Sequence, residues 1–122
     1  MASKKYFYGN IEDITIENTN YRNVLWTKKD TGSLQLVVMS LKPLEAIDAE
    51  THSHTTQFIR VERGRGQAIL GKDTLTLKSG DAIIIPPGTK HTIINKSKTK
   101  SLKLYTLYSP AEHKAGLIQT FK

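Results

Sequence analysis

Short apolar runs separated by turn-forming residues recur along most of this 122-residue chain, and their spacing limits the folds that it can adopt. Three of the separators are Asp30-Thr31-Gly32, Gly71-Lys72-Asp73 and Pro86-Pro87-Gly88, which are typical of tight turns between strands. Many short strands at regular spacing predict an all-β sandwich or barrel with antiparallel pairing. We predict strands over residues 21–27, 34–41, 57–61, 67–70, 74–77, 82–85, 91–95 and 101–108.

Four segments carry more specific expectations. Residues 82–85 are all apolar, which predicts a strand that is covered on both faces. Residues 34–41 are partly apolar on both faces, and such a strand would suit a sheet-to-sheet interface between two copies of the chain. Residues 11–16 alternate partially, which predicts one more short extended segment. The tail over residues 109–122 is irregular, with room for one helical turn, and could fold over an opening as a lid.

The length of the chain indicates one domain over residues 1–122, with a core at about residues 34–108 followed by the tail. There is no cysteine, so disulfides and thiolate metal sites are excluded, and any metal must be bound by nitrogen and oxygen atoms. No apolar run has the length of a membrane span, and the N-terminus lacks the apolar core of a signal peptide. We therefore expect a cytoplasmic protein with no membrane partner.

The net charge of +7 indicates attraction to anions, such as a phosphorylated or carboxylated small molecule. Nucleic acid is not expected as a partner, because the basic residues are dispersed and no stretch combines them with exposed aromatic residues. The basic run over residues 96–100 is interpreted as a solvated loop between two strands.

Candidate metal ligands are concentrated in the segment that follows residue 49. Glu50, His52 and His54 would share one face if this segment were extended, because side chains two apart on a strand point the same way. Gln57 lies an odd number of residues from these three, so on a continuous strand it would point to the opposite face. It would join them only if a bulge or bend intervened. His91 follows a Pro-Gly turn that would fix its position. Imidazole nitrogen together with carboxylate or amide oxygen suits zinc, manganese, iron, nickel or copper.

The segment from Gly80 to Asn95 resembles the second motif of the cupin superfamily. That motif runs Gly, five residues, Pro-x-Gly, two residues, His, three residues, Asn. This chain matches it at every position with Gly80, Pro86, Gly88, His91 and Asn95.

The first motif of the superfamily runs Gly, five residues, His-x-His, three or four residues, Glu, six residues, Gly, and here it is degenerate. Counting back from Gly64 places Gln57 at the glutamate position, His52 and Glu50 at the two histidine positions, and Leu44 at the leading glycine. This alignment satisfies every spacing and is preferred.

A second alignment takes His52-Ser53-His54 as the histidine pair but leaves only two residues before Gln57. The preferred alignment implies the ligand set Glu50, His52, Gln57 and His91, with His54 in reserve. Glutamine in place of glutamate lowers the negative charge of the site and would weaken its affinity for hard cations.

The resemblance implies a double-stranded β-helix, also called a jelly roll or cupin barrel, with a divalent transition metal near its mouth, and a homodimer. The stretches around Gln57 and at residues 104–110 are similar to small cupins that are labelled mannose-6-phosphate isomerase-like. The reaction that this suggests is a metal-dependent isomerisation of a sugar or sugar phosphate. In that reaction Glu50 or His54, whichever is not a ligand, would move the proton.

Two alternatives stay open. The same ligands could hold redox-active iron in a dioxygenase. The irregular first motif, with its lost glycine and substituted ligands, would also suit a non-catalytic module that binds a small molecule in the barrel. We expect ordinary structural positions for three other residues. Arg60 is expected to be solvated, Tyr108 to pack in the core, and His113 to lie on the surface.

Overall fold

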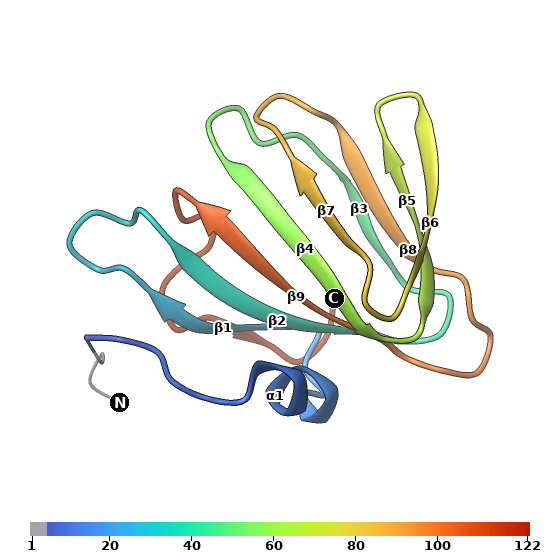
Figure 1. Cartoon of the computed structure of the whole chain (residues 1–122), viewed down its shortest axis with the longest axis horizontal. Helices are drawn as coiled ribbons and strands as arrows, with labels where there is room; N and C mark the ends of the chain where they lie inside the picture. Colours follow the sequence, from blue (N-terminus) through green and yellow to red (C-terminus); the bar gives the residue numbers. More distant parts are fainter. Residues whose placement is uncertain (1–4) are drawn as a thin grey trace.

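The computed structural model describes residues 5–122, and its strands form two antiparallel sheets (Figure 1). The prediction of an all-β, antiparallel fold is confirmed. In chain order the elements are α1 Ile11–Glu17, β1 Arg22–Thr27, β2 Gln35–Leu41, β3 Ala46–Glu50, β4 Thr56–Arg63, β5 Arg65–Leu70, β6 Asp73–Lys78, β7 Ala82–Ile85, β8 His91–Asn95, β9 Leu102–Ser109 and β10 Ile118–Gln119.

The larger sheet has the strand order β10-β1-β2-β9-β4-β7, and the smaller has the order β3-β8-β5-β6. Strand alternation divides each sheet into an inner and an outer face. The inner faces contribute one shared apolar core, which includes Val37, Met39, Ile59, Ile93 and Leu104. Both motif segments lie on this scaffold: β3, the loop after it and β4 carry the first motif, and β7 and β8 carry the second.

The strand prediction for residues 82–85 is confirmed as β7, but the expectation that both of its faces are covered is wrong. β7 is an edge strand, and the Ile84 side chain is 65% exposed on its outer face. The helix α1 packs over β9, β2 and β4, and β7 lies beyond β4 at the sheet edge. An apolar run is compatible with a strand that is buried on both faces. Whether both faces are buried depends on which other elements pack against the strand.

The N-terminal segment is a helix, so the extended structure expected for residues 11–16 is wrong. Asn10 caps α1: its side-chain oxygen accepts a hydrogen bond from the backbone N–H of Asp13 at 2.9 Å. Glu12 and Asp13 place negative charge in the first turn, where the helix dipole favours it. These end effects, together with packing against the sheet, outweigh the strand preference of the isoleucine and threonine residues.

Helix α1 covers the outer face of β2, on which Val38 is fully buried. The second apolar face of residues 34–41 is therefore covered within the chain, and it offers no evidence for contact with a second copy. Among residues 5–122 no helix has the length and apolar character needed to cross a membrane.

The C-terminal tail runs back along the sheet end where β2 begins and β9 ends. The N–H of Ala111 donates to the carbonyl oxygen of Gly32 at 2.7 Å, and β10 pairs with β1 in the register Arg22 to Gln119. Residues 111–113 do not form the helical turn for which the sequence left room. The tail is instead held in an irregular path by hydrogen bonds to the strands.

Candidate metal centre

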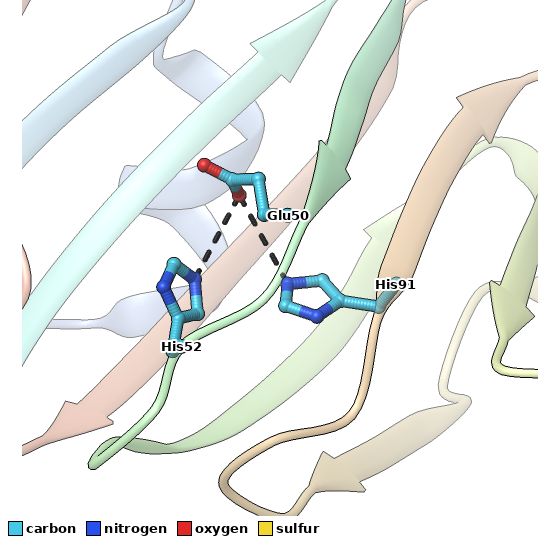
Figure 2. A group of neighbouring side chains, drawn as sticks. All are labelled: Glu50, His52 and His91. Atoms are coloured by element: carbon cyan, nitrogen blue, oxygen red, sulfur yellow. Dashed lines mark ion pairs between the residues drawn. The ribbon is translucent and has the colours of Figure 1, made fainter.

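Three side chains converge at one end of the barrel: Glu50, His52 and His91 (Figure 2). Glu50 ends β3 and pairs directly with His91, the first residue of β8. The Glu50 carboxylate oxygen Oε1 lies 3.8 Å from Nε2 of His52 and 3.9 Å from Nε2 of His91. One ligand atom from each of the three residues falls within 4.8 Å of the others.

The loop that carries His52 is tied to the turn that precedes His91. The N–H of Gly88 donates to the carbonyl oxygen of His52 at 2.8 Å. Gly88 has a φ of 85°, a left-handed conformation that favours glycine, and this closes the Pro-Gly turn. The two motifs therefore hold each other in place, although they are far apart in the sequence.

Both imidazole rings are buried, with His52 8% and His91 1% exposed. Nδ1 of His91 lies 3.0 Å from the carbonyl oxygen of Thr89, and Nδ1 of His52 lies 3.3 Å from Oε2 of Glu112. Both of these oxygens accept hydrogen bonds, so they favour the tautomer in which Nδ1 carries the proton and Nε2 keeps its lone pair. Neither Nε2 atom has a hydrogen-bond partner in the described part of the chain.

Two buried nitrogen atoms without partners, both turned towards a carboxylate, fit a metal ion. Ligand atoms about 2.0–2.2 Å from a tetrahedral zinc ion lie roughly 3.3–3.6 Å apart, so the two distances from Glu50 Oε1 to the histidine Nε2 atoms are close to those that a bound ion requires. Glu50, His52 and His91 could thus bind a divalent metal ion. Their nitrogen and oxygen atoms do not select one transition metal.

Gln57 faces the barrel interior because the chain bends in the loop between Glu50 and β4, which meets the expected condition of a bulge or bend. Residues 51–55 form a loop, so the positions on either side of it do not belong to one strand. In β4 the buried residues are Gln57, Ile59 and Val61, which share the inner face. The Gln57 side-chain nitrogen donates to Thr106 Oγ1 at 3.1 Å, while its oxygen Oε1 is buried without a hydrogen-bond partner among residues 5–122. This orphan oxygen is a fourth candidate ligand atom.

His54 lies in the loop after β3, is exposed, and is not part of the converging group. The group instead contains Glu50 and His52, the pair in the alignment that counts back from Gly64. Leu44, which that alignment places at the leading glycine, has a φ of 65°. Among residues 5–122, Leu44 is the only non-glycine residue with a positive φ, and it stands where the family motif has glycine.

The tail contributes a carboxylate that was not among the site residues predicted from the sequence. Glu112 contacts His52, and its other oxygen accepts a hydrogen bond from Thr55 Oγ1 at 3.2 Å. The side-chain oxygen of Gln35 accepts hydrogen bonds from the N–H groups of Glu112 and His113 at 3.1 and 3.0 Å. No spacing rule links residue 112 to residue 52, so only the folded path of the tail reveals this contact.

His113 is partly buried beside Tyr108, which corrects the expected surface position. Their rings meet edge to face with centroids 5.1 Å apart, and Nε2 of His113 lies 3.3 Å from the Tyr108 hydroxyl. Burial, with smaller contributions from Arg22 and His52, lowers the pKa of His113 to about 4, and burial raises the pKa of Tyr108. At neutral pH His113 is therefore uncharged, and its ring forms a hydrogen bond with the Tyr108 hydroxyl.

Arg22 is a buried cation inside the barrel and was not among the residues predicted from the sequence. It pairs with Met39, a core residue, and directly opposed residues point to the same face of a sheet. Its guanidinium lies over the Tyr21 ring and donates to the side chain of Gln119, while its Nε atom is buried without a partner in residues 5–122. The sequence did indicate this orientation, because Arg22 lies two residues before Val24 on β1 and therefore points to the same face of the strand.

Residues 37–108 match the Cupin_2 family model, which describes a cupin domain. The chain is 47% identical over 112 residues to Uncharacterized protein L612 of Acanthamoeba polyphaga mimivirus, covering 89% of this chain and 68% of that protein. It is 39% identical over 124 residues to Uncharacterized protein YrkC of Bacillus subtilis (strain 168), covering 97% of this chain and 64% of that protein. The chain thus spans only about two thirds of the length of these curated relatives.

The crystal structure of BH2720 from Bacillus halodurans has a similar fold. It superposes with a TM-score of 0.88 at 37% sequence identity, covering 94% of this chain and 89% of that one. The family match extends from β2 to the end region of β9. The jelly-roll prediction is confirmed, and the chain belongs to the cupin domain family.

Proposed function

We propose that this cupin is a metal-dependent enzyme that acts on a small polar or anionic molecule such as a sugar or sugar phosphate. One observation carries the proposal: Nε2 of His52 and Nε2 of His91 are buried, have no hydrogen-bond partner among residues 5–122, and face the Glu50 carboxylate. Buried polar atoms without partners are costly, and a bound metal ion would satisfy them. Three or four protein ligands leave coordination positions for a substrate.

An anionic group on the substrate is supported by the charge distribution in the barrel. Arg22 offers a buried guanidinium with an unpartnered Nε atom, and the charges of Arg22 and Glu50 both influence the Tyr108 hydroxyl. A guanidinium that is largely out of water binds carboxylate or phosphate more strongly than an exposed one. Arg22 would therefore orient a carboxylate or phosphoryl group near the site.

The chemistry of the proposed reaction is an isomerisation at adjacent substrate oxygens. When bound, a divalent metal would polarise a carbonyl or hydroxyl oxygen of the substrate. Glu50 would move a proton if it is released from metal binding, since its side chain remains about one third exposed. His54 is exposed outside the group, so its sequence-based role as a proton carrier would require the loop to move.

The first test is the metal content of tag-free protein, measured by mass spectrometry. His91→Ala removes a buried candidate ligand, while His54→Ala makes the same change outside the group and serves as the matched control. We expect a near-stoichiometric transition metal in wild type and His54→Ala, and loss of metal in His91→Ala. No metal in wild type after loading with Zn²⁺, Mn²⁺, Fe²⁺ or Ni²⁺ would remove the enzyme proposal and leave a non-catalytic module that binds small molecules.

The second test is turnover with a defined probe. Metal-loaded protein is incubated with mannose 6-phosphate in D₂O, and deuterium incorporation at C2 is followed by proton NMR. An aldose–ketose isomerase working by proton transfer exchanges this hydrogen, and His91→Ala should abolish the exchange. Full metal occupancy without exchange or product would contradict this substrate and reaction.

A dioxygenase is the second candidate, and the composition of the site favours it. Two histidines with one carboxylate are the ligand set of many non-haem iron oxygenases. This alternative predicts oxygen uptake that depends on Fe²⁺ and is absent with Zn²⁺. Exchange supported by Zn²⁺ or Mn²⁺ alone would favour the isomerase.

The remaining partner expectations are also proposals. We infer a cytoplasmic homodimer without a membrane or nucleic-acid partner, on the basis of the family resemblance and the composition. Light scattering with size-exclusion chromatography tests the dimer directly. A monomer at micromolar concentration would refute it.

A further inference from the structure

A basic groove lies at the end of the barrel opposite the metal centre. Strand β4 runs from Gln57 beside the metal centre to Arg63 in the groove, about 20 Å away at the usual rise per strand residue. The groove has a volume of about 760 Å³, and no acidic residue lines it. The residues that line it include five with basic side chains, Arg63, Arg65, Lys78, Lys100 and Lys103, and three serines, Ser79, Ser97 and Ser101.

The strand registers place like charges directly opposite one another at this groove. Arg63 of β4 pairs with Lys103 of β9, and Arg65 of β5 pairs with Lys78 of β6. Opposed like charges destabilise a sheet. Burial and the nearby Arg63 charge also lower the pKa of Lys103. The fold thus concentrates positive charge here at a cost in stability.

Little in the chain neutralises this charge. Lys78 lies 3.7 Å from a carboxylate oxygen of Asp81, and Lys103 donates to the backbone carbonyl of Asn18. Within residues 5–122, Arg63, Arg65 and Lys100 have no ion pair with a carboxylate. A ligand with several negative charges would relieve the repulsion among these side chains.

The loop that forms one wall is held in place before any ligand binds. The buried Asn95 side chain donates to the carbonyl oxygens of Leu41, Lys42 and Lys100 and accepts from the N–H of Ser97. Ser97 Oγ accepts from the N–H groups of Thr99 and Lys100, and its own hydroxyl proton is left to donate. Residues 96–100 thus form the expected exposed loop between β8 and β9, and Ser97 and Lys100 of this loop line the groove.

The opposite wall packs against this loop through a glycine. Gly64 lies between Arg63 and Arg65 with a φ of 103°, and a Cβ atom there would come 2.7 Å from the backbone oxygen of Ser101. This close approach fixes the backbone that carries the two arginines relative to the loop. A fixed backbone lowers part of the ordering cost of binding a ligand, while the exposed arginine side chains become ordered on binding.

We propose that the groove binds a small molecule through two linked phosphoryl groups. Arginine, lysine and serine side chains provide charge-assisted and neutral hydrogen bonds to phosphate oxygens. The volume lies in the range of small-molecule sites, and five cations exceed what one phosphoryl group can neutralise. No aromatic residue lines the groove, so the base stacking used to bind single-stranded nucleic acid has no platform there.

Isothermal titration with inorganic pyrophosphate tests the proposal in the full chain. Arg63→Gln/Arg65→Gln should weaken binding about tenfold or more, because charged hydrogen bonds are lost. Lys29→Gln/Lys72→Gln removes the same charge from exposed positions away from the groove. This control should bind within about twofold of wild type, because distant exposed charges are screened. Lys100→Gln, a single change in the exposed loop, should also weaken binding and covers the case in which the double variant misfolds.

Two further measurements distinguish binding in the groove from binding at the metal centre, and binding of pyrophosphate from binding of other anions. His91→Ala should bind pyrophosphate as wild type does, so failure of the proposed enzyme function leaves this result unaffected. Inorganic phosphate and sulfate at equal ionic strength should bind about tenfold more weakly than pyrophosphate, because each presents one anionic group in place of two. Equal binding by the arginine variant and its control would overturn the proposal. Tighter binding of a deoxythymidine decamer than of pyrophosphate would overturn it in favour of a nucleic-acid interface.

Discussion

Oε2 of Glu112, in the C-terminal tail, lies 3.3 Å from Nδ1 of His52, on the side of the ring opposite the candidate metal atom position. A carboxylate at this place holds the ring in one orientation and one tautomer, and it makes Nε2 a better ligand. Thr55 holds Glu112, and Gln35 holds the backbone of the tail. The tail thus supports the candidate metal centre through Glu112.

Glu112→Gln should weaken metal binding about tenfold to a hundredfold, because loss of a partner that orients a ligand has effects of this size. The glutamine retains an oxygen that can accept from Thr55, so the tail should stay in place. Competition between the protein and a chromogenic Zn²⁺ chelator measures the affinity. Glu17→Gln makes the same change on α1 and should leave the affinity unaltered. Equal affinities for the two variants would show that the contact with His52 does not support metal binding.

Gln57→Glu should make the metal-free protein less stable and increase its stabilisation by Mn²⁺. In the absence of metal, a carboxylate at this buried position lacks a compensating charge, at a cost of about 1–3 kcal/mol. With metal, the added negative charge favours a hard cation.

Thermal unfolding with and without Mn²⁺ checks both parts of this prediction, with Gln67→Glu as a control on a less buried position of β5. If Mn²⁺ stabilises Gln57→Glu against thermal unfolding no more than it stabilises wild type, residue 57 is not a metal ligand.

Leu44→Gly should stabilise the protein by about 1 kcal/mol. Leu44 has a φ of 65°, a conformation that costs a residue with a side chain about 1–2 kcal/mol. Glycine avoids this cost, but its greater conformational freedom in the unfolded chain offsets part of the stabilisation. Little burial is lost, because Leu44 is 60% exposed.

Urea unfolding measures the change, and Leu75→Gly on β6 is the matched comparison. Leu75 is an exposed strand residue without positive φ, so its replacement should destabilise by about 0.5–1 kcal/mol. If both variants lose stability alike, the left-handed conformation of Leu44 does not persist in solution.

His113 should make the protein less stable in acid. Its pKa is about 4 in the folded chain, below the ordinary value of 6.5, so the unfolded chain takes up the proton more readily. The contribution of His113 to stability is therefore complete above about pH 6.5 and decreases as the pH falls towards 4. The folded form resists protonation because His113 is buried beside Tyr108 and lies near Arg22 and His52.

The free energy of unfolding at pH 4.5 and 7.5 tests this pH dependence. His113→Gln retains an acceptor for the Tyr108 hydroxyl and should lose less stability between the two pH values than wild type. His54→Gln, at an exposed histidine, should lose as much as wild type. An identical pH dependence in all three proteins would contradict a buried, neutral His113.

Most of the barrel could be predicted from the sequence, because strand alternation and turn residues act over short distances. The bounds of β7 and β8 match the predicted runs, and the five positions from Gly80 to Asn95 identify the second motif. The preferred alignment of the first motif also selects Glu50 and His52, which the structure brings together with His91 of the second motif. Helix α1 escaped prediction because its capping residue and its packing outweigh the strand preference of its side chains.

By itself, the sequence determined the antiparallel β architecture, the family and the residues able to bind a metal, because local periodicity and motif spacing encode them. Only the tertiary structure decided that Gln57 faces inward, that His54 stays outside, and that Glu112 supports His52. Only the structure also gathers the dispersed cations Arg63, Arg65 and Lys103 into one groove. These relationships arise from contacts between strands, loops and the tail that are distant in the chain, and spacing along one segment carries no information about them.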